Sequence, residues 1–294
     1  MKFITPYVKL LRPAQWVKNI FVWLPLFFSG NVLQDTYFES TLWAFVAFCL
    51  LSSAIYCFND IMDVAADREH PVKRRRPLAS GQMSRGAAVT EMLLLLAAVM
   101  AIAVRQFASI PAAWIILAVY LALNLGYSLG LKRIPIVDVF IIALGFVLRL
   151  AMGGVVCGIW LSPWIVCLTF LLTLTLAFAK RRDDLLLYKQ RGKELRRSVR
   201  DYNLPYMDQV LGLLGAITMV CYIIYSVSPD VESRMGSHYV YISSIFVLAG
   251  ILRYLQITLV HEQSGSPTRT FLTDGFLLTC MACWVAFFVV LLYV

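Results

Sequence analysis

The stretch FNDIMDVAADREHPVKRRRPLASG, residues 58–81, crowds four acids and six bases into a chain that is otherwise mostly apolar. The acids come first, and most of the bases follow in the run KRRR at residues 73–76. Long apolar runs lie on both sides of the stretch. It therefore marks the place where a membrane-embedded chain meets water, and its charges need a reason to gather there.

The composition of the whole chain is that of a membrane protein. Of its 294 residues, 60% are hydrophobic and 15% are charged, whereas a soluble domain carries about 25% charged residues. A transmembrane helix needs about 20 apolar residues, and nine runs approach that length. They cover residues 14–33, 38–60, 86–105, 109–130, 136–158, 161–179, 207–228, 239–260 and 271–293. The sequence predicts an all-α polytopic membrane protein with nine transmembrane helices.

The positions of the basic residues predict how the chain is oriented. All but three of the 26 Lys and Arg residues precede or lie near the start of the first run, or lie in or beside the even-numbered connections; the exceptions are Arg105, Arg149 and Arg234. The positive-inside rule then places the N-terminus in the cytoplasm and, after nine spans, the C-terminus outside. The basic residues that give the net charge of +9 lie mostly at the membrane edge. We therefore expect no nucleic-acid partner.

Several other kinds of site find no support in the sequence. The seven cysteines lie in or beside apolar runs, and the CxxC pair at residues 280–283 has no histidine nearby, so neither a metal nor a redox role is expected. No glycine-rich phosphate loop of the nucleotide-binding kind is present. The acidic and basic stretch at residues 58–81 therefore remains the main functional candidate.

The acids of this stretch are spaced for one face of a helix. Asn59, Asp63 and Asp67 are four residues apart and would share a face if the second span continued; Asp60 and Asp67 are seven apart and lie close to that face. Magnesium prefers oxygen ligands and is often held by one or two carboxylates together with substrate phosphates. The following bases could bind the remaining phosphate oxygens. The alternative is a solvated loop whose charges pair among themselves.

These residues resemble a known family. The pattern NDxxDxxxD at residues 59–67, followed by RPLASG at 76–81, resembles the first aspartate motif of the UbiA superfamily of intramembrane prenyltransferases, and YSLGLKRIPIVD at 127–138 adds to the likeness. The resemblance covers nearly the whole chain. It implies a single domain, residues 1–294, whose helices surround a central cavity open to lipid. Cytoplasmic motif loops at about 61–85, 131–135 and 180–206 would cap that cavity.

The second motif departs from that of ordinary prenyltransferases. In AFAKRRDDLLLYKQRGKELRRSVRDY, residues 177–202, Lys180, Arg181 and Arg182 stand where acids are usual. With LRPAQWVKNIFVWLPLFFSG at 11–30, it is similar to the family branch of decaprenyl-phosphate phosphoribosyltransferases. The resemblance implies a Mg²⁺-dependent transferase of a bacterial inner membrane that moves 5-phosphoribose from phosphoribosyl diphosphate to a polyprenyl phosphate for cell-wall biogenesis. The alternatives are a prenyltransferase for aromatic or quinone precursors and a non-catalytic polyprenyl-lipid transporter. The sequence leaves open whether the protein forms a homo-oligomer.

The resemblance also implies roles for individual residues. It assigns metal binding to Asn59, Asp60, Asp63 and Asp67, with Asn59, Asp63, Asp67 and Lys132 as the catalytic set. Substrate binding is assigned to Lys18, Asn19, Lys73, Arg76, Tyr127, Asp138, Arg149, Lys180, Arg181 and Asp184. Two of these have structural alternatives. Asp138 could form a simple ion pair with Lys132 or Arg133. Arg149, deep in a span, could be a buried partner for a helix C-terminus or for backbone carbonyls instead of a ligand contact.

Overall fold

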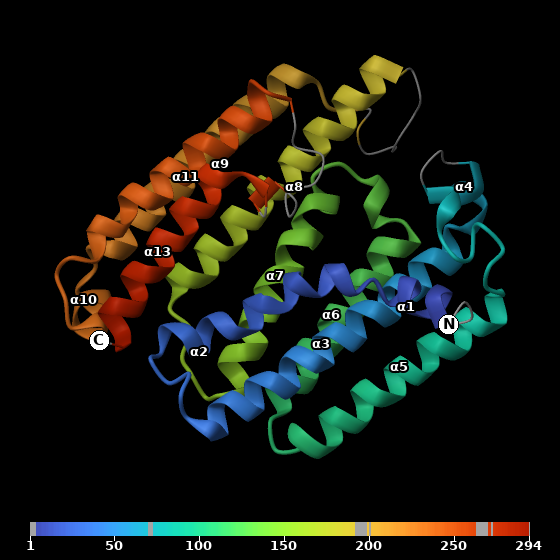
Figure 1. The fold of residues 1–294 in the computed structure, drawn as a ribbon, viewed down its shortest axis with the longest axis horizontal. Helices are drawn as coiled ribbons and strands as arrows, with labels where there is room; N and C mark the ends of the chain where they lie inside the picture. Colours follow the sequence, from blue (N-terminus) through green and yellow to red (C-terminus); the bar gives the residue numbers. More distant parts are fainter. Residues whose placement is uncertain are drawn as a thin grey trace. The chain divides into compact units, whose positions relative to one another are not determined.

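The computed structural model describes residues 4–69, 73–191, 199, 201–262, 270–271 and 273–293 (Figure 1), and the side chains of residues 4, 189–191 and 234 are left out of the description. The elements are α1 (Ile4–Leu11), η1 (Pro13–Trp23), α2 (Leu24–Phe28), α3 (Asp35–Met62), α4 (Val64–Glu69), η2 (Lys73–Arg75), α5 (Arg85–Gln106), α6 (Pro111–Leu129), η3 (Leu131–Arg133), α7 (Val137–Val156), α8 (Pro163–Arg191), α9 (Leu204–Ser226), α10 (Pro229–Met235), η5 (Val240–Ser243), α11 (Ser244–Leu259) and α13 (Gly275–Tyr293). The symbol η marks a 3₁₀ helix.

The predicted all-helical membrane class is confirmed. Eight helical segments in the described part of the chain are long and apolar enough to cross a membrane, and no strand occurs there. The remaining run, residues 14–33, is not one α-helix: it falls on the 3₁₀ helix η1 and the five-residue helix α2. The predicted count of nine therefore stays a prediction.

The predicted motif loops contain more helix than the sequence suggested. The loop expected from residue 180 begins later, because α8 continues without a break to Arg191. Short helices α4 and η2 lie within the loop predicted at 61–85, and η3 lies within the one at 131–135. Residues 70–72, 192–198 and 200 of these predicted loops lie outside the described residues.

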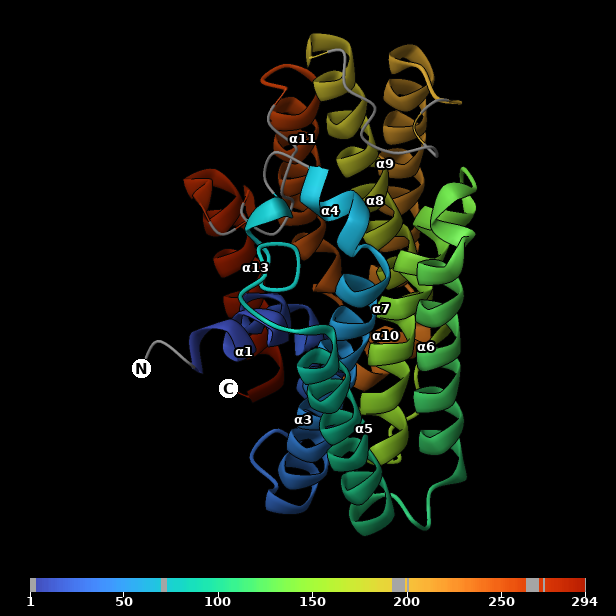
Figure 2. The ribbon, with the colours of Figure 1, turned by 90° about the vertical axis from the view of Figure 1, so that its right-hand side faces the viewer.

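The chain divides into two compact units, which we describe separately. The first comprises residues 1–131 and 145–161. Its central helix is α3, which packs along α5 and also contacts η1, α1 and α6; Figures 1 and 2 both show α3 and α5 side by side. The buried residues of α3 include many small ones, such as Ala44, Ala47, Ser53 and Ala54. Small residues allow helices to approach closely in lipid, where packing replaces the hydrophobic effect as the main driving force.

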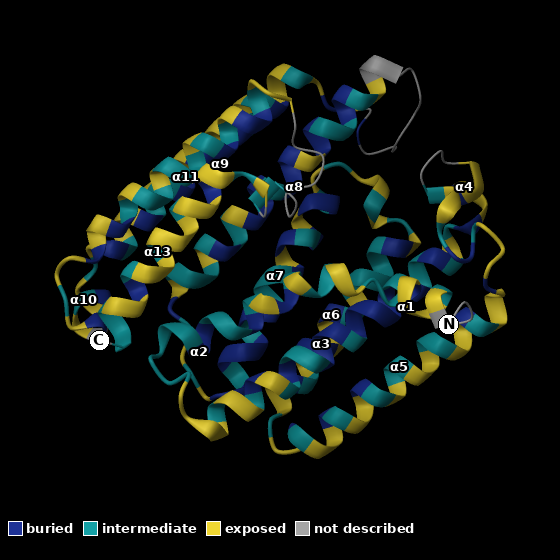
Figure 3. Ribbon diagram, in the orientation of Figure 1, coloured by how far each residue is buried: buried dark blue, intermediate teal, exposed yellow. Residues whose placement is uncertain are grey.

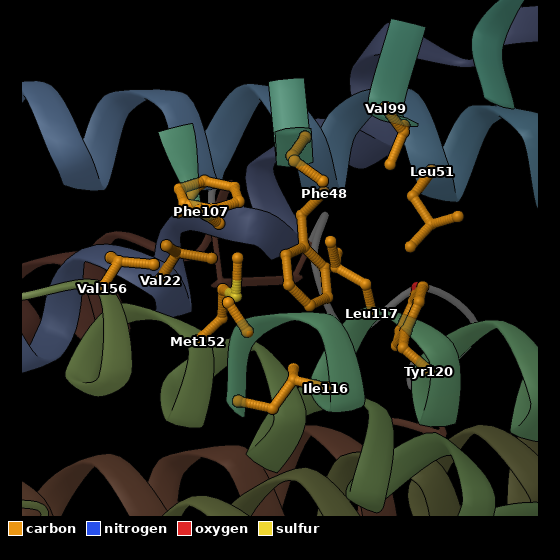
Figure 4. Close-up of a cluster of buried hydrophobic side chains, with 14 of the residues drawn as sticks. Val22, Phe48, Leu51, Val99, Phe107, Ile116, Leu117, Tyr120, Met152 and Val156 are labelled. Carbon is orange, nitrogen blue, oxygen red and sulfur yellow. The ribbon is translucent and has the colours of Figure 1, made fainter. Parts of the chain in front are cut away.

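The core of the first unit combines side chains from several of its helices. Phe48 of α3, Val99 of α5, Tyr120 of α6 and Met152 of α7 belong to one buried cluster (Figure 4), and Val22 of η1 joins it. One face of α5 is instead largely exposed (Figure 3), and the large apolar residues exposed on α5 include Leu93, Leu94 and Met100. Such a face is suited to lipid, so α5 lies at the periphery of this unit.

The second unit comprises residues 132–144 and 162–294. Within it, α8 packs along α9, and α11 contacts both α9 and α13; these helices form the yellow-to-red part of Figure 1. Its buried core includes Phe178, Met207, Leu211, Tyr254 and Leu277. The start of α9 is capped by Asn203, whose side-chain oxygen accepts a hydrogen bond from the Tyr206 backbone N–H at 2.8 Å.

Gly153 allows a very close approach of α7 to η1, and this gives a first prediction. A Cβ atom at Gly153 would lie 2.0 Å from the Val22 carbonyl oxygen and 2.9 Å from its carbonyl carbon. We expect Gly153→Ala to lower the free energy of unfolding by about 1–3 kcal/mol because two backbones must move apart. Thermal unfolding of the detergent-purified protein, followed by tryptophan fluorescence, measures the effect.

Gly212 of α9 provides the matched control, because nothing lies within 4 Å of a Cβ added there. Within a helix, alanine is usually more stable than glycine by up to about 1 kcal/mol. Gly212→Ala should therefore leave the free energy of unfolding unchanged or raise it slightly. Equal unfolding temperatures for the two variants would contradict the close packing of Gly153 against Val22.

Candidate functional site

The aspartate motif lies where α3 ends. The α-helix stops at Met62, and Asp63 follows with φ −94° and ψ 5° before α4 begins. The sequence predicted one continuing helix for these acids, and the break at Asp63 corrects that prediction. The hydrogen-bond spacing nevertheless continues, because Asp63 N–H bonds the Asn59 carbonyl at 2.9 Å and Asp67 N–H bonds the Asp63 carbonyl at 2.8 Å.

Asp60 and Asp67 are brought together by one arginine. The Arg76 Nη1 atom lies 3.0 Å from Asp60 Oδ1 and 2.6 Å from Asp67 Oδ2. Both carboxylates are almost fully buried, whereas the Arg76 side chain is 26% exposed. Buried carboxylates need a counter-charge, and the shared guanidinium nitrogen supplies it for both. Asp60, the acid with the weaker sequence signal, is therefore a full member of the cluster.

Two further bases reach the same carboxylates. Arg12 Nη2 contacts Asp60 Oδ1, and Lys73 Nζ lies 3.9 Å from Asp67 Oδ1. Lys73 and Arg76 were expected near phosphate, and the structure places both at the acids. No role at this site was predicted for Arg12, and no local spacing reveals one, because Arg12 and Asp60 are 48 residues apart. Arg74 and Arg75 are exposed, in keeping with a role in topology.

The donor atoms at this cluster fit a magnesium ion in part. Among the described residues, no group of three or more His, Cys, Asp or Glu side chains could hold a metal ion by itself. However, the oxygens of Asp60 and Asp67 converge on a single positively charged nitrogen. Magnesium sites that use one or two carboxylates and complete their coordination with substrate phosphates need no more protein ligands than this. Asp60 and Asp67 are thus the residues that would hold the ion.

Arg149 forms a second buried polar cluster in the first unit. Its Nε donates to Asn19 Oδ1 at 2.6 Å, Nη1 to the Gly145 carbonyl at 2.7 Å, and Nη2 to the Tyr120 hydroxyl at 2.6 Å. The guanidinium carbon also lies 4.8 Å from the centre of the Tyr120 ring and 5.3 Å from that of Phe146. The three protein acceptors and the aromatic rings account for the buried cation. This geometry favours the structural alternative raised for Arg149.

Arg181 is held by two acids of the second unit. Its Nε lies 2.6 Å from Asp138 Oδ2 and its Nη1 lies 3.0 Å from Asp184 Oδ2. The Arg181 side chain is only 1% exposed, so it orders the start of α7 against α8. The partners predicted for Asp138 from the sequence were Lys132 and Arg133, not Arg181. The missing signal was the continuation of α8, which places Arg181 on a helix instead of in a loop.

Tyr202 fixes the turn that leads into α7. Ile136 has a left-handed backbone with φ 68°, which is rare for a β-branched residue, and its N–H donates to the Tyr202 hydroxyl at 2.5 Å. Burial raises the pKa of Tyr202 to about 12, so the hydroxyl stays neutral at physiological pH. Such strain persists only where surrounding contacts fix it. Here the strained residue directly precedes α7, the helix that carries Asp138.

Two other arginines link the helices of the second unit. Arg182 donates from Nε to Asp208 Oδ1 at 2.6 Å and from Nη1 to the Thr258 carbonyl at 2.8 Å, which joins α8 to α9 and α11. Arg253 bonds Asp274 at 2.8 Å, and Asp274 also accepts the Leu277 N–H of α13 at 2.9 Å. None of these pairs was expected from the sequence, since the partners are distant in the chain.

The remaining predicted substrate residues lie in both units. Lys18 lies in η1, beside Asn19. Tyr127 is near the end of α6 and Lys132 is in η3; both are half-buried. Lys180 is exposed on α8, one residue before Arg181. The side chains of Lys180 and Lys132 are therefore at least partly accessible to solvent, whereas that of Arg181 is buried.

The described part of the chain is thus that of an all-helical membrane protein in which two buried carboxylates are covered by bases. Comparison with known proteins shows the family. Residues 20–273 match the UbiA prenyltransferase family, and relatives reach 33% identity over nearly the whole chain. The chain belongs to the UbiA prenyltransferase family.

Two similar relatives are bacterial enzymes. The decaprenyl-phosphate phosphoribosyltransferase of Corynebacterium glutamicum is 33% identical over 290 residues, covering 98% of this chain and 86% of the relative. That of Mycolicibacterium smegmatis is 33% identical over 293 residues, covering 96% and 91%. Among solved structures, a UbiA homolog from Archaeoglobus fulgidus bound to GPP and Mg²⁺ has a TM-score of 0.72 at 20% identity and covers 98% of this chain and all of that chain. This last likeness shows the shared fold.

Proposed function

We propose that this protein transfers 5-phosphoribose from phosphoribosyl diphosphate to a polyprenyl phosphate, giving polyprenyl-phosphate 5-phosphoribose and diphosphate. The observation that carries the proposal is the 33% identity, over nearly the full length of both chains, to decaprenyl-phosphate phosphoribosyltransferases. The replacement of acids by Lys180, Arg181 and Arg182 in the second motif supports the same branch. The product would serve as a sugar-donor precursor for the cell envelope.

The proposed reaction breaks the bond between ribose C1 and the diphosphate oxygen and forms a bond from C1 to a phosphate oxygen of the lipid. The diphosphate leaves with the electron pair. A bound Mg²⁺ would supply positive charge to the leaving diphosphate. The lipid phosphate is already anionic at neutral pH, so no strong general base is needed. The part of the protein is to orient the reacting groups and to stabilise negative charge that develops on the leaving group.

The proposed roles of Asp60, Asp67, Lys73 and Arg76 are supported by the cluster described above, and the other roles by the family resemblance. Asp60 and Asp67 hold the metal ion, with Asn59 and Asp63 beside them on the same segment. Arg76 and Lys73, which already contact these acids, bind the donor diphosphate. Lys132 and Tyr127 contact the donor, and Lys180 binds the donor 5-phosphate or the lipid phosphate. Lys18 binds a phosphate head group.

The buried residues of the proposed site position other groups. Asp138, Arg181 and Asp184 form one ion-paired set that orders the start of α7 and the end of α8. Asn19 and Arg149 hold η1 against α7. We assign these five residues to the site as supports for the residues that contact substrate, since each of them is bonded to another residue of the protein.

The membrane arrangement completes the proposal. Nine spans, the first made by η1 and α2, surround a central cavity open to lipid within a single domain. The N-terminus faces the cytoplasm of a bacterial inner membrane and the C-terminus faces outward, in line with the distribution of basic residues.

A labelled-donor assay tests this function. Membranes containing the protein should transfer radiolabelled phosphoribose to added polyprenyl phosphate, and a chelator of divalent cations should abolish the transfer. Membranes without the protein are the control. Failure to label the lipid, together with consumption of a prenyl diphosphate and an aromatic acid, would establish an aromatic prenyltransferase instead. Lipid movement that survives Asp63→Ala, without release of diphosphate, would establish a transporter.

A further inference from the structure

The two buried acids of the aspartate motif are already covered by bases in the ligand-free protein. Three cationic side chains, from Arg12, Lys73 and Arg76, face the two carboxylates of Asp60 and Asp67. The carboxylate side chains are 2% and 4% exposed, whereas the basic ones are 25% to 35% exposed. The bases therefore lie between the acids and solvent, so a cation that approaches the acids meets the bases first.

This arrangement opposes the entry of a divalent cation by itself. Three bases already face the two buried carboxylates, and like charges at contact distance repel strongly in a partly buried site. In addition, the Arg76 nitrogen occupies the position between the two carboxylate oxygens. A cation can enter only if bases leave the acids, and an incoming diphosphate gives the displaced bases an anionic partner.

Arg12 is the base that the fold holds most firmly on Asp60. Its backbone is left-handed, with φ 52° and ψ 58°, a conformation that costs energy in a non-glycine residue. The surrounding contacts fix it: the Gln15 N–H donates to the Arg12 carbonyl at 2.8 Å, and the Ser53 hydroxyl donates to the neighbouring Leu11 carbonyl at 2.8 Å. The guanidinium also lies 4.8 Å from the Tyr56 ring centre.

We propose that Arg12 is a positioning residue that keeps Asp60 neutralised until the donor diphosphate arrives, so that the divalent cation and the diphosphate bind as a pair. The inference rests on the proposed function in one respect, the use of Asp60 and Asp67 as metal ligands. It extends that function by adding a residue 48 positions away in the chain and an interdependence between two ligands. By linkage, each of the two ligands then raises the affinity for the other to the same extent.

The test measures metal binding without turnover. Manganese(II) binding to the detergent-purified protein is titrated by electron paramagnetic resonance, with and without inorganic diphosphate. The variant is Arg12→Asn, because asparagine tolerates a left-handed backbone. Arg74→Asn is the matched control: it removes the same charge from the exposed segment η2, and Arg74 has no contact with either acid.

We expect the wild-type protein and Arg74→Asn to bind manganese weakly alone and about tenfold more tightly with diphosphate. Arg12→Asn should bind manganese alone about tenfold more tightly than the wild type, with a smaller gain from diphosphate. A structural role alone would not raise metal affinity. Equal manganese affinities for Arg12→Asn and Arg74→Asn would overturn the inference, as would the absence of any diphosphate effect in the wild type. If paired binding is observed but no phosphoribose is transferred, the inference holds and the proposed function fails.

Discussion

Asp67→Asn is expected to reduce phosphoribosyl transfer by two to three orders of magnitude. The substitution removes one of the two buried charges that converge on Arg76 but leaves an oxygen that can still accept its hydrogen bond. Local structure should therefore survive, and the loss should fall on charge stabilisation of the leaving diphosphate. Initial rates with radiolabelled phosphoribosyl diphosphate, in membranes adjusted to equal protein content, measure the effect.

Asp230→Asn is the matched control for this experiment. Asp230 lies in the first turn of α10 and is exposed, so the same chemical change there should leave the rate within about twofold. Asp60→Asn should behave like Asp67→Asn, since both acids contact the same arginine nitrogen. If Asp67→Asn kept more than a tenth of the wild-type rate, the paired carboxylates would not form the metal site.

Arg149→Met is expected to destabilise the protein by about 2–4 kcal/mol. Methionine fills a similar volume, but the Asn19 and Tyr120 side chains lose the donors that they contact at 2.6 Å. Each buried polar group left without a partner costs about 1–3 kcal/mol, and the relief of a buried charge offsets part of the loss. The unfolding free energy in detergent, from thermal or denaturant titration, measures the change.

One further variant separates charge from geometry at Arg149, and a second variant, at Arg105, is the control. Arg149→Lys keeps the charge but cannot donate in the three directions of a guanidinium, so it should recover only part of the stability. Arg105→Met removes an exposed arginine at the end of α5 and should have little effect. A raised donor KM at unchanged stability in Arg149→Met would instead support the substrate-binding role that the sequence analysis assigned to this residue.

The helical membrane class could be predicted from the sequence because a run of apolar residues of sufficient length has few other structures available in lipid. Eight of the nine predicted runs correspond to long helices. The first run does not, because hydropathy reports how apolar a segment is but not whether its hydrogen bonds follow the α or the 3₁₀ pattern. The length of α8 was underestimated for a related reason: charges at residues 180–184 ended the apolar run without ending the helix.

The candidate site was predictable where its residues are close in sequence. The Asp60 and Asp67 pair could be recognised by its spacing of seven, close to two turns of an α-helix, and the basic run after it supplies Lys73 and Arg76. The contacts of Arg12 with Asp60 and of Arg181 with Asp138 join residues 48 and 43 positions apart. Such pairs depend on which helices pack together, which no periodicity within one segment encodes.

The 3₁₀ helix η1 covers more of the bilayer thickness per residue than an α-helix would. A 3₁₀ helix rises about 2.0 Å per residue, compared with about 1.5 Å in an α-helix. The 11 residues of η1 are therefore about 22 Å long and the five residues of α2 add about 7 Å. Laid end to end, these sixteen residues match the roughly 30 Å thickness of the hydrocarbon layer. Sixteen residues are too few for an α-helix to cross the hydrocarbon layer. Because most of them form a 3₁₀ helix, which rises more per residue, the segment is nevertheless about as long as that layer is thick.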